Sequence, residues 1–217
     1  MKVTLKVATS LDARIATASG ESQWITCEAA RAAVHDLRRQ HDAVLVGSGT
    51  LLADDPRLTV RGLEVQKQPD RVVLDSKLVT TPAARVFEAE TGRVIIFTRT
   101  DPQYGSGVAA LRSRGALVEA VSHERSGLNL KDVVSRLSAL GISSVFIEGG
   151  GLVAASFLMA GLIDRIEWFR APIILGGDGR AVFGPVGVNN LSAAFRFVRT
   201  GVRNVGSDLW ETYERGE

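Results

Sequence analysis

The sequence contains a single cysteine, Cys27, among its 217 residues. One cysteine excludes an internal disulfide, and we therefore expect the chain to work in the reducing cytoplasm. Its three histidines, His35, His41 and His123, do not stand at zinc-ligand spacing with cysteine. We expect no structural or catalytic metal site.

Long apolar runs and strong net charge are also missing. No apolar run reaches the roughly 18 residues that a membrane span needs, and residues 1–12 lack the apolar core and cleavage site of a signal peptide. A net charge of +2 is too small to imply binding to nucleic acid or to an anionic membrane. Because no repeat or linker divides the chain, we expect one domain, 1–217.

The most informative stretch joins a strand, a glycine turn and a helix. Val145–Ile147 predicts a buried strand, Glu148 ends it, Gly149–Gly151 form the turn, and an apolar helical pattern opens at Leu152. Backbone without Cβ atoms can approach a phosphate closely, and the first N–H groups of the helix can donate to it. The alternative is a tight connection with a surface Glu148, since the spacing is not that of GxGxxG.

Strands and helices alternate along most of the chain. The patterns predict strands at 3–7, 43–46, 71–76, 93–99, 116–121 and 145–147, and helices at 26–40, 107–114 and 130–140. Thr26 and Asn129 are the expected N-caps, and Gly141 the expected helix stop. A longer strand at 166–175, with a bend or edge at Pro172, and two antiparallel strands within 195–213 follow. This order predicts a largely parallel sheet covered on both faces.

Polar residues follow the carboxyl ends of four predicted strands, at 47–50, 75–76, 98–99 and 148–151. Ligands bind beyond such ends in open α/β sheets, so this convergence favours a ligand-binding enzyme. The polar loop 9–23 is longer than connection requires, which also points to function. Residues 62–70 are polar and expected to be exposed.

Two residues allow two interpretations each. Trp24 is either an anchor at the edge of the core or a flat wall for a planar ring. Asp54 is either a site carboxylate or part of a helix end, because Asp55 precedes Pro56 and is restrained from the helical region. The sequence leaves both choices open.

Several segments together resemble the reductase half of the bifunctional riboflavin-biosynthesis deaminase/reductase. They are Thr4–Thr26, the helix with Arg38, Val46–Arg61, Arg71–Ser76, Ile147–Gly151 and Arg170–Arg180. The resemblance implies a three-layer α/β/α dihydrofolate-reductase-like fold with a mostly parallel central sheet and antiparallel C-terminal strands. It also implies a homodimer that reduces 5-amino-6-(5-phosphoribosylamino)uracil with NADPH by hydride transfer to ribose C1.

The chain departs from the bifunctional form in two places. The H-x-E and P-C-x-x-C signature of the zinc deaminase is absent, so the resemblance implies a reductase without its own deaminase domain. Ala13 stands where the family usually has glycine, a position that we expect to serve a loop conformation.

The resemblance also assigns residues to the site. On the cofactor side it implies Ala8, Trp24, Thr50, Asp54, Ser76, Gly150, Gly151, Leu152, Val153, Ala154, Ala155 and Ser156. On the side of the phosphorylated ribosylaminopyrimidine substrate it implies Ser22, Thr26, Arg38, Leu58, Arg61 and Glu148. Arg38 and Arg61 suit a phosphate clamp, and Ser76 with Lys77 or Arg99 suits the 2′-phosphate of NADPH.

Asp54, Glu148 and Lys6 are the candidates for supplying the proton, and the sequence does not rank them. Two other functions stay open. One is an NADPH reductase of the same fold acting on a dihydropterin or a related pathway analogue. The other is a nucleotide-binding module without turnover.

Overall fold

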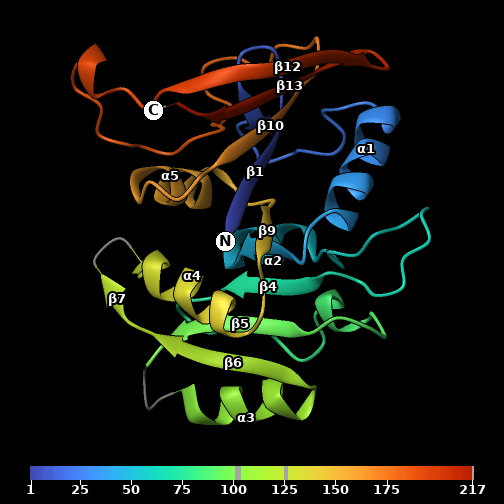
Figure 1. Ribbon diagram of the computed structural model, residues 1–217, viewed down its shortest axis with the longest axis vertical. Coiled ribbons are helices and arrows are strands. Elements are labelled where there is room, and N and C mark those ends of the chain that lie inside the picture. Colours follow the sequence, from blue (N-terminus) through green and yellow to red (C-terminus); the bar gives the residue numbers. More distant parts are fainter. Residues whose placement is uncertain (101–103, 125–126, 217) are drawn as a thin grey trace. The chain divides into compact units, whose positions relative to one another are not determined.

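The computed structural model describes residues 1–100, 104–124 and 127–216 (Figure 1). The chain divides into two compact units. Unit one comprises Met1 and His35–Phe146, and unit two comprises Lys2–Val34 and Ile147–Glu217. The division falls inside the helix α1 (Glu28–Arg39) and the strand β9 (Ser144–Ile147), and each unit is described on its own.

Unit one is built on a parallel sheet. Its strands, in spatial order, are β3 (Ala43–Gly47), β4 (Asp70–Leu74), β5 (Val94–Arg99) and β6 (Ala116–Val121). All five residues of β3 are buried, as expected of a strand covered on both faces. The four strands predicted at these places are confirmed.

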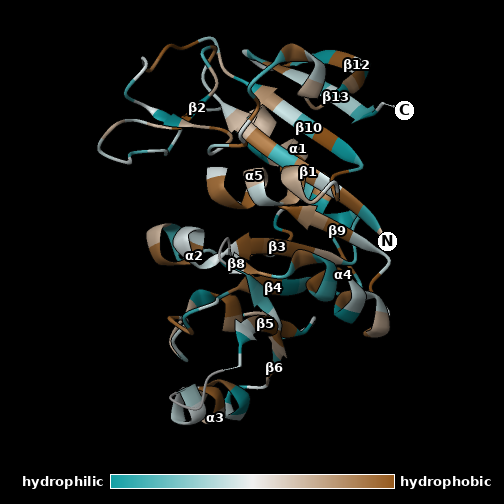
Figure 2. Cartoon of the chain, turned by 90° about the vertical axis from the view of Figure 1, so that its left-hand side faces the viewer, coloured by the Kyte–Doolittle hydropathy of each residue, from teal (hydrophilic) through white to brown (hydrophobic). Residues whose placement is uncertain are grey.

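Helices cover both faces of that sheet. They are α2 (Ser48–Asp54), α3 (Gly105–Ser113) and α4 (Leu130–Ala139). The unit also contains a 3-10 turn, η1 (Arg85–Phe87), and two short strands, β7 (His123–Glu124) and β8 (Gly127–Leu128). Figure 2 shows α2 and α4 on opposite sides of β3 and β4. Asn129 caps α4 by accepting from the N–H groups of Lys131 and Asp132, and Gly141 follows the helix with a φ of +83°. The predicted cap and stop are therefore confirmed.

Two segments of unit one differ in detail from their predictions. Among the polar residues 47–50 that follow the strand, Gly47 is the N-cap of α2 and the helix already begins at Ser48. The segment 62–70 is exposed over most of its length, but Asp70 at its end is 2% exposed and begins β4. This carboxylate tolerates burial because Arg93 donates to it from Nε at 2.7 Å and Nη2 at 2.5 Å.

Unit two contains a mixed sheet. Its strands lie in the order β12 (Phe197–Val205), β13 (Asp208–Arg215), β10 (Arg165–Arg170) and β1 (Lys2–Thr9) (Figure 1). β1 pairs with β10 in parallel, while the two remaining pairs are antiparallel, as predicted for the C-terminal strands. The unit also holds the helix α5 (Gly151–Met159) and the 3-10 turn η3 (Leu191–Ala193).

The strand predicted at 166–175 is shorter in the structure. β10 ends at Arg170, and the N–H of Ala171 makes one more bond to the carbonyl of Thr9. The next residue, Pro172, has no N–H and cannot continue the ladder.

The predicted loop 9–23 also contains regular structure. β2 (Arg14–Ala16) pairs antiparallel with β11 (Arg180–Ala181). Beside this pair, Asp12 accepts from the backbone N–H of Leu175 at 3.1 Å and of Gly176 at 2.8 Å, and from Ser10 Oγ at 2.6 Å. The Ser10 bond, followed by the backbone bonds, lowers the pKa of Asp12 to about 2.

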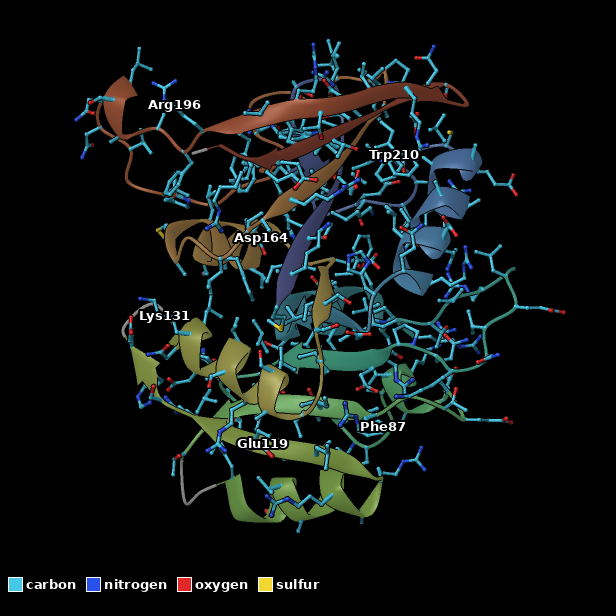
Figure 3. All side chains as sticks on the ribbon, in the orientation of Figure 1. Phe87, Glu119, Lys131, Asp164, Arg196 and Trp210 are labelled. Atoms are coloured by element: carbon cyan, nitrogen blue, oxygen red, sulfur yellow. The ribbon has the colours of Figure 1, made fainter. Side chains whose placement is uncertain are left out.

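Trp210 on β13, labelled in Figure 3, connects that strand to the neighbouring β10 through side-chain contacts. Its ring lies 4.7 Å from that of Phe169, and its Nε1 donates to Glu167 Oε2 at 2.6 Å. Glu167 has no exposed surface, and its other oxygen accepts from Arg165 Nε at 2.5 Å. Both oxygens of this buried carboxylate are thus hydrogen-bonded, so it stabilises the sheet.

Candidate active site

The predicted site residues divide between the two units. Unit one contains Arg38, Thr50, Asp54, Leu58, Arg61 and Ser76. Unit two contains Lys6, Ala8, Ser22, Trp24, Thr26, Glu148 and the range 150–156.

In unit one, α1 holds the segment that carries Arg61. Arg38 is buried, and its Nη1 donates to the carbonyl oxygen of Thr59 at 2.7 Å. One turn earlier on the same side of the helix, Nδ1 of His35 accepts from the backbone N–H of Arg61 at 3.2 Å. These two bonds hold residues 59–61 against α1 on the side of Arg38, and the side chain of Arg61 is exposed.

Sequence reasoning considered His35 only as a zinc ligand and missed this role. Its spacing of three residues before Arg38 placed both side chains on one helix face, which was the available signal. Nothing in the sequence showed that the partner would be the backbone of Arg61.

Leu58, predicted to contact substrate, is only 2% exposed. It packs in the apolar core of unit one, in the same cluster as Val46 and Leu51. Its φ of +57° lies in the left-handed region, which turns the chain toward Thr59. The residue therefore shapes the segment that carries Arg61 and offers little surface to a ligand.

Thr50 and Asp54 lie four residues apart on α2, so they share one side of the helix. Asp54 is the last helical residue, and the helix-end interpretation is thus confirmed. The same residue also suits proton donation, because desolvation raises the pKa of its carboxyl group. A carboxyl group with a raised pKa retains its proton closer to neutral pH.

Ser76 is the second residue after β4 and is half-buried. The neighbouring Asp75, also predicted at this strand end, is fully buried and accepts from the N–H of Thr80 at 2.7 Å and from its hydroxyl at 2.6 Å. Asp75 therefore closes a turn. Arg99 ends the adjacent parallel strand, and its Nη2 donates to Tyr104 Oη at 3.1 Å.

In unit two, one turn presents Ser22, Trp24 and Thr26 together. The carbonyl of Ser22 accepts from the N–H of Ile25 at 3.2 Å, which closes the turn around Trp24. Trp24 is 67% exposed, so the interpretation as an anchor at the core edge is wrong. Arg31 on α1 places its guanidinium 4.5 Å from the centre of the Trp24 ring.

Lys6 and Ala8 point to one face of β1, since side chains alternate along a strand. The opposite face carries Leu5 and Val7, which are buried in the core. The structure therefore brings these two predicted site residues together on a single face.

The glycine turn before α5 leaves backbone donors at the helix start. Gly150 is the N-cap, and the first bond of the helix runs from the N–H of Ala154 to the carbonyl of Gly150 at 3.1 Å. The N–H groups of residues 151–153 precede that bond and can donate to an anion. A Cβ at Gly151 would lie 2.6 Å from the carbonyl oxygen of Ala181, so backbone packing also requires this glycine.

The rest of the predicted range 150–156 is less open. Ala154 and Ala155 are 0% and 3% exposed, and Ser156 donates its hydroxyl to the carbonyl of Leu152. Ala154 and Ala155 therefore offer almost no surface to a ligand, whereas Ser156 is partly exposed.

The described part of the chain contains neither a cluster of metal-ligating side chains nor a membrane-spanning helix. No group of three or more histidine, cysteine, aspartate or glutamate side chains there could hold a metal ion. No helix within it is long and apolar enough to span a bilayer. Two cavities, of about 330 Å³ in unit two and about 280 Å³ in unit one, contain none of the predicted site residues.

The chain is similar in sequence to known proteins. The profile of the RibD C-terminal domain family matches residues 1–210. The riboflavin biosynthesis protein RibD of Aquifex aeolicus is 36% identical over 213 residues, which cover 98% of this chain and 57% of the relative. The 2,5-diamino-6-ribosylamino-4(3H)-pyrimidinone 5′-phosphate reductase of Methanothermobacter thermautotrophicus is 37% identical, with coverage of 97% and 96%. The chain thus spans about half of the first relative and nearly all of the second.

Solved structures show the same fold. RibD of Acinetobacter baumannii aligns with a TM-score of 0.85 at 32% identity, over 99% of this chain and 58% of that one. The Thermotoga maritima diaminohydroxyphosphoribosylaminopyrimidine deaminase/5-amino-6-(5-phosphoribosylamino)uracil reductase aligns with a TM-score of 0.81 at 34% identity, over 99% and 56%. The predicted three-layer α/β class, mostly parallel with antiparallel C-terminal strands, is confirmed.

Proposed function

The chain belongs to the RibD C-terminal domain family, and on this premise we propose that it reduces 5-amino-6-(5-phosphoribosylamino)uracil with NADPH. The product is 5-amino-6-(5-phosphoribitylamino)uracil, an intermediate of riboflavin biosynthesis. The Thermotoga relative, whose name includes this reductase activity, supports the choice of substrate.

The observation that carries the proposal is that α1, which bears Arg38, is hydrogen-bonded to the segment that bears Arg61. Arg38 is fixed through Thr59, and the backbone of Arg61 is fixed through His35. Arg38 on α1 and Arg61 on the segment that α1 holds supply two guanidinium groups, which suit the phosphate of a sugar phosphate. In this proposal Arg38 and Arg61 bind the substrate phosphate.

A reductase of this family uses a nicotinamide cofactor, and the residues present fit such a group. The exposed ring of Trp24 offers a flat surface, and the N–H groups of residues 151–153 suit a diphosphate. The choice of NADPH over NADH is assigned to Ser76 with Arg99, which lie at the carboxyl ends of neighbouring parallel strands. When bound, NADPH supplies the hydride that adds to C1 of the ring-opened ribose.

Reduction at C1 also requires a proton on the neighbouring nitrogen. Among the three candidates, Asp54 is favoured because desolvation raises the pKa of its carboxyl group. Glu148 and Lys6 remain the alternatives in unit two. Asp54 therefore holds the proton, and the arginine pair holds the phosphate end of the substrate.

A second substrate is favoured by a specific observation. The chain covers 96% of the Methanothermobacter reductase but only 57% of the Aquifex RibD. The name of that full-length relative contains 2,5-diamino-6-ribosylamino-4(3H)-pyrimidinone 5′-phosphate, the diamino form of the substrate. Both compounds carry the same ribose phosphate, so the arginine pair would serve either one.

Steady-state NADPH oxidation with each of the two pyrimidines tests the proposal. We expect turnover with the uracil compound at a higher kcat/KM than with the diamino compound, and none with a dihydropterin. Turnover of the dihydropterin alone would replace the proposal with the pterin-reductase alternative. NADPH binding without oxidation of any substrate would indicate the module without turnover.

We also propose a cytoplasmic homodimer. Val198 and Val202 on β12, at the edge of the unit-two sheet, are 58% and 56% exposed. An exposed apolar edge strand is a surface that proteins usually cover. Sedimentation equilibrium should give twice the mass of 23.2 kDa, and a monomer at micromolar concentration would contradict the dimer.

A further inference from the structure

Unit two contains two arginine–tryptophan stacks that differ in exposure. Arg203 lies 3.6 Å from the centre of the Trp210 ring, and Trp210 is 7% exposed and hydrogen-bonded to Glu167. Arg31 lies 4.5 Å from the centre of the Trp24 ring, and Trp24 is 67% exposed. The first stack completes a core, whereas the second covers one face of a ring that is otherwise open.

Arg31 is held in place by a second contact on the same turn. Its Nη1 donates to the carbonyl oxygen of Thr26 at 2.7 Å, while its backbone N–H bonds to the carbonyl of Cys27 in the first turn of α1. One guanidinium thus contacts both the ring of Trp24 and the backbone two residues later. A large side chain this exposed would otherwise sample several rotamers, at an entropic cost to any ligand that needs one of them.

We propose that Arg31 is a positioning residue that holds Trp24 in one orientation, so that the free face of the indole can receive the planar nicotinamide end of the cofactor. This inference rests on the proposed function, because the ring that packs on Trp24 is that of NADPH. Arg31 touches neither cofactor nor substrate and acts through Trp24. Its positive charge over one face is attracted to the ring quadrupole, and the stack leaves the other face for the ligand.

The first experiment needs no ligand. Acrylamide quenching of the Trp24 fluorescence is obtained as the difference between a protein and its Trp24→Phe counterpart, which removes the signals of Trp168 and Trp210. Because the guanidinium shields one of two ring faces, we expect Arg31→Met to raise the Trp24 quenching constant by about two-fold. Arg31→Lys keeps the charge and should give an intermediate value.

The second experiment measures the coupling to the cofactor. We expect Arg31→Met to raise KM for NADPH by about two- to five-fold, the effect of losing an exposed cation–π contact. In a Trp24→Ala background the same substitution should add no further increase, because the residue through which Arg31 acts is already gone. Arg31→Lys should recover part of the wild-type KM.

Arg203→Met is the matched control, since it removes the same side chain from the buried stack. It should leave KM for NADPH unaltered. Additive effects of Arg31→Met and Trp24→Ala on that KM, or an unaltered Trp24 quenching constant in an active enzyme, would overturn the inference alone. A wild-type protein that neither binds nor oxidises NADPH would overturn the proposed function, and the cofactor role of Arg31 with it.

Discussion

Each unit contains a turn that leads through glycine into a helix, and the two turns differ in the space around their glycines. In unit one a Cβ at Gly49, in the first turn of α2, would meet nothing within 4 Å. In unit two a Cβ at Gly151 would lie 2.6 Å from the carbonyl of Ala181, and one at Gly149 would lie 2.7 Å from Val153. Similar glycine-containing sequences thus form one turn with open space around its glycine and one turn that is crowded.

The helices that follow the two turns also differ in the polarity of their side chains. α2 places Thr50 and Asp54 on one side, and the carboxyl group of Asp54 has a raised pKa. α5 consists mostly of apolar residues, so its first turn can offer a ligand little besides backbone N–H groups. We therefore expect the turn in unit one to act through its side chains and the turn in unit two through its backbone N–H groups.

Substitution of Asp54 tests the side-chain half of this comparison most strongly. Asp54→Asn should lower kcat by about 10²- to 10⁴-fold, the usual contribution of a general acid. Because the raised pKa belongs to the group that must be protonated, wild-type kcat should fall as pH rises through it. The pH profile of kcat checks this, and an Asn variant that keeps the same falling limb would assign the proton to Glu148 or Lys6.

Arg38→Ala extends the comparison to substrate binding in unit one. Loss of a charged hydrogen-bond donor should raise KM for the phosphorylated substrate by about ten- to a hundred-fold, with a smaller change in kcat. Arg39→Ala on the same helix is the control, because Arg39 pairs only with Asp36 in the described contacts. An unaltered KM in Arg38→Ala would show that the phosphate binds elsewhere.

Gly151→Ala tests the crowded turn. The added methyl group must displace the backbone at Ala181, so we expect a loss of about 1–3 kcal/mol in the free energy of unfolding. Urea denaturation followed by circular dichroism measures this loss. An Ala variant as stable as the wild type would mean that Gly151 serves ligand approach rather than packing.

Gly49→Ala should change the free energy of unfolding least, and it should raise this free energy where Gly151→Ala lowers it. Since the new methyl group meets no atom, alanine should stabilise α2 by up to about 1 kcal/mol through its helix propensity. The same denaturation experiment should give a midpoint at or above the wild-type value. A clear loss of stability would remove the distinction between the two turns.

Local signals predicted much of the fold correctly. Asn129 and Gly141 bounded α4, and the apolar run 145–147 marked a buried strand, because caps and short apolar runs act within a few residues. The pairing of β2 with β11 was not predictable, since it joins segments about 165 residues apart with two or three residues each. Nor could the sequence show that residues 47–50 begin a helix.

In the site, too, contacts between distant residues could not be predicted. The resemblance named Arg38, Arg61 and Trp24, yet it did not reveal the side chains that hold them. His35 and Arg31 act through backbone and ring contacts, which leave no motif in the sequence. Those two residues are therefore what the structure adds.

The bonds around Asp12 have a consequence for acid solutions. Its pKa in the folded chain is about 2, against an ordinary value of 3.8, so the ionised form is favoured by folding. The contribution of Asp12 to stability is therefore complete above pH 3.8 and disappears as pH falls through 2. In mildly acidic buffer Asp12 should keep its hydrogen bonds between the loop at Ser10 and the loop at Gly176. These bonds should be lost only in strong acid.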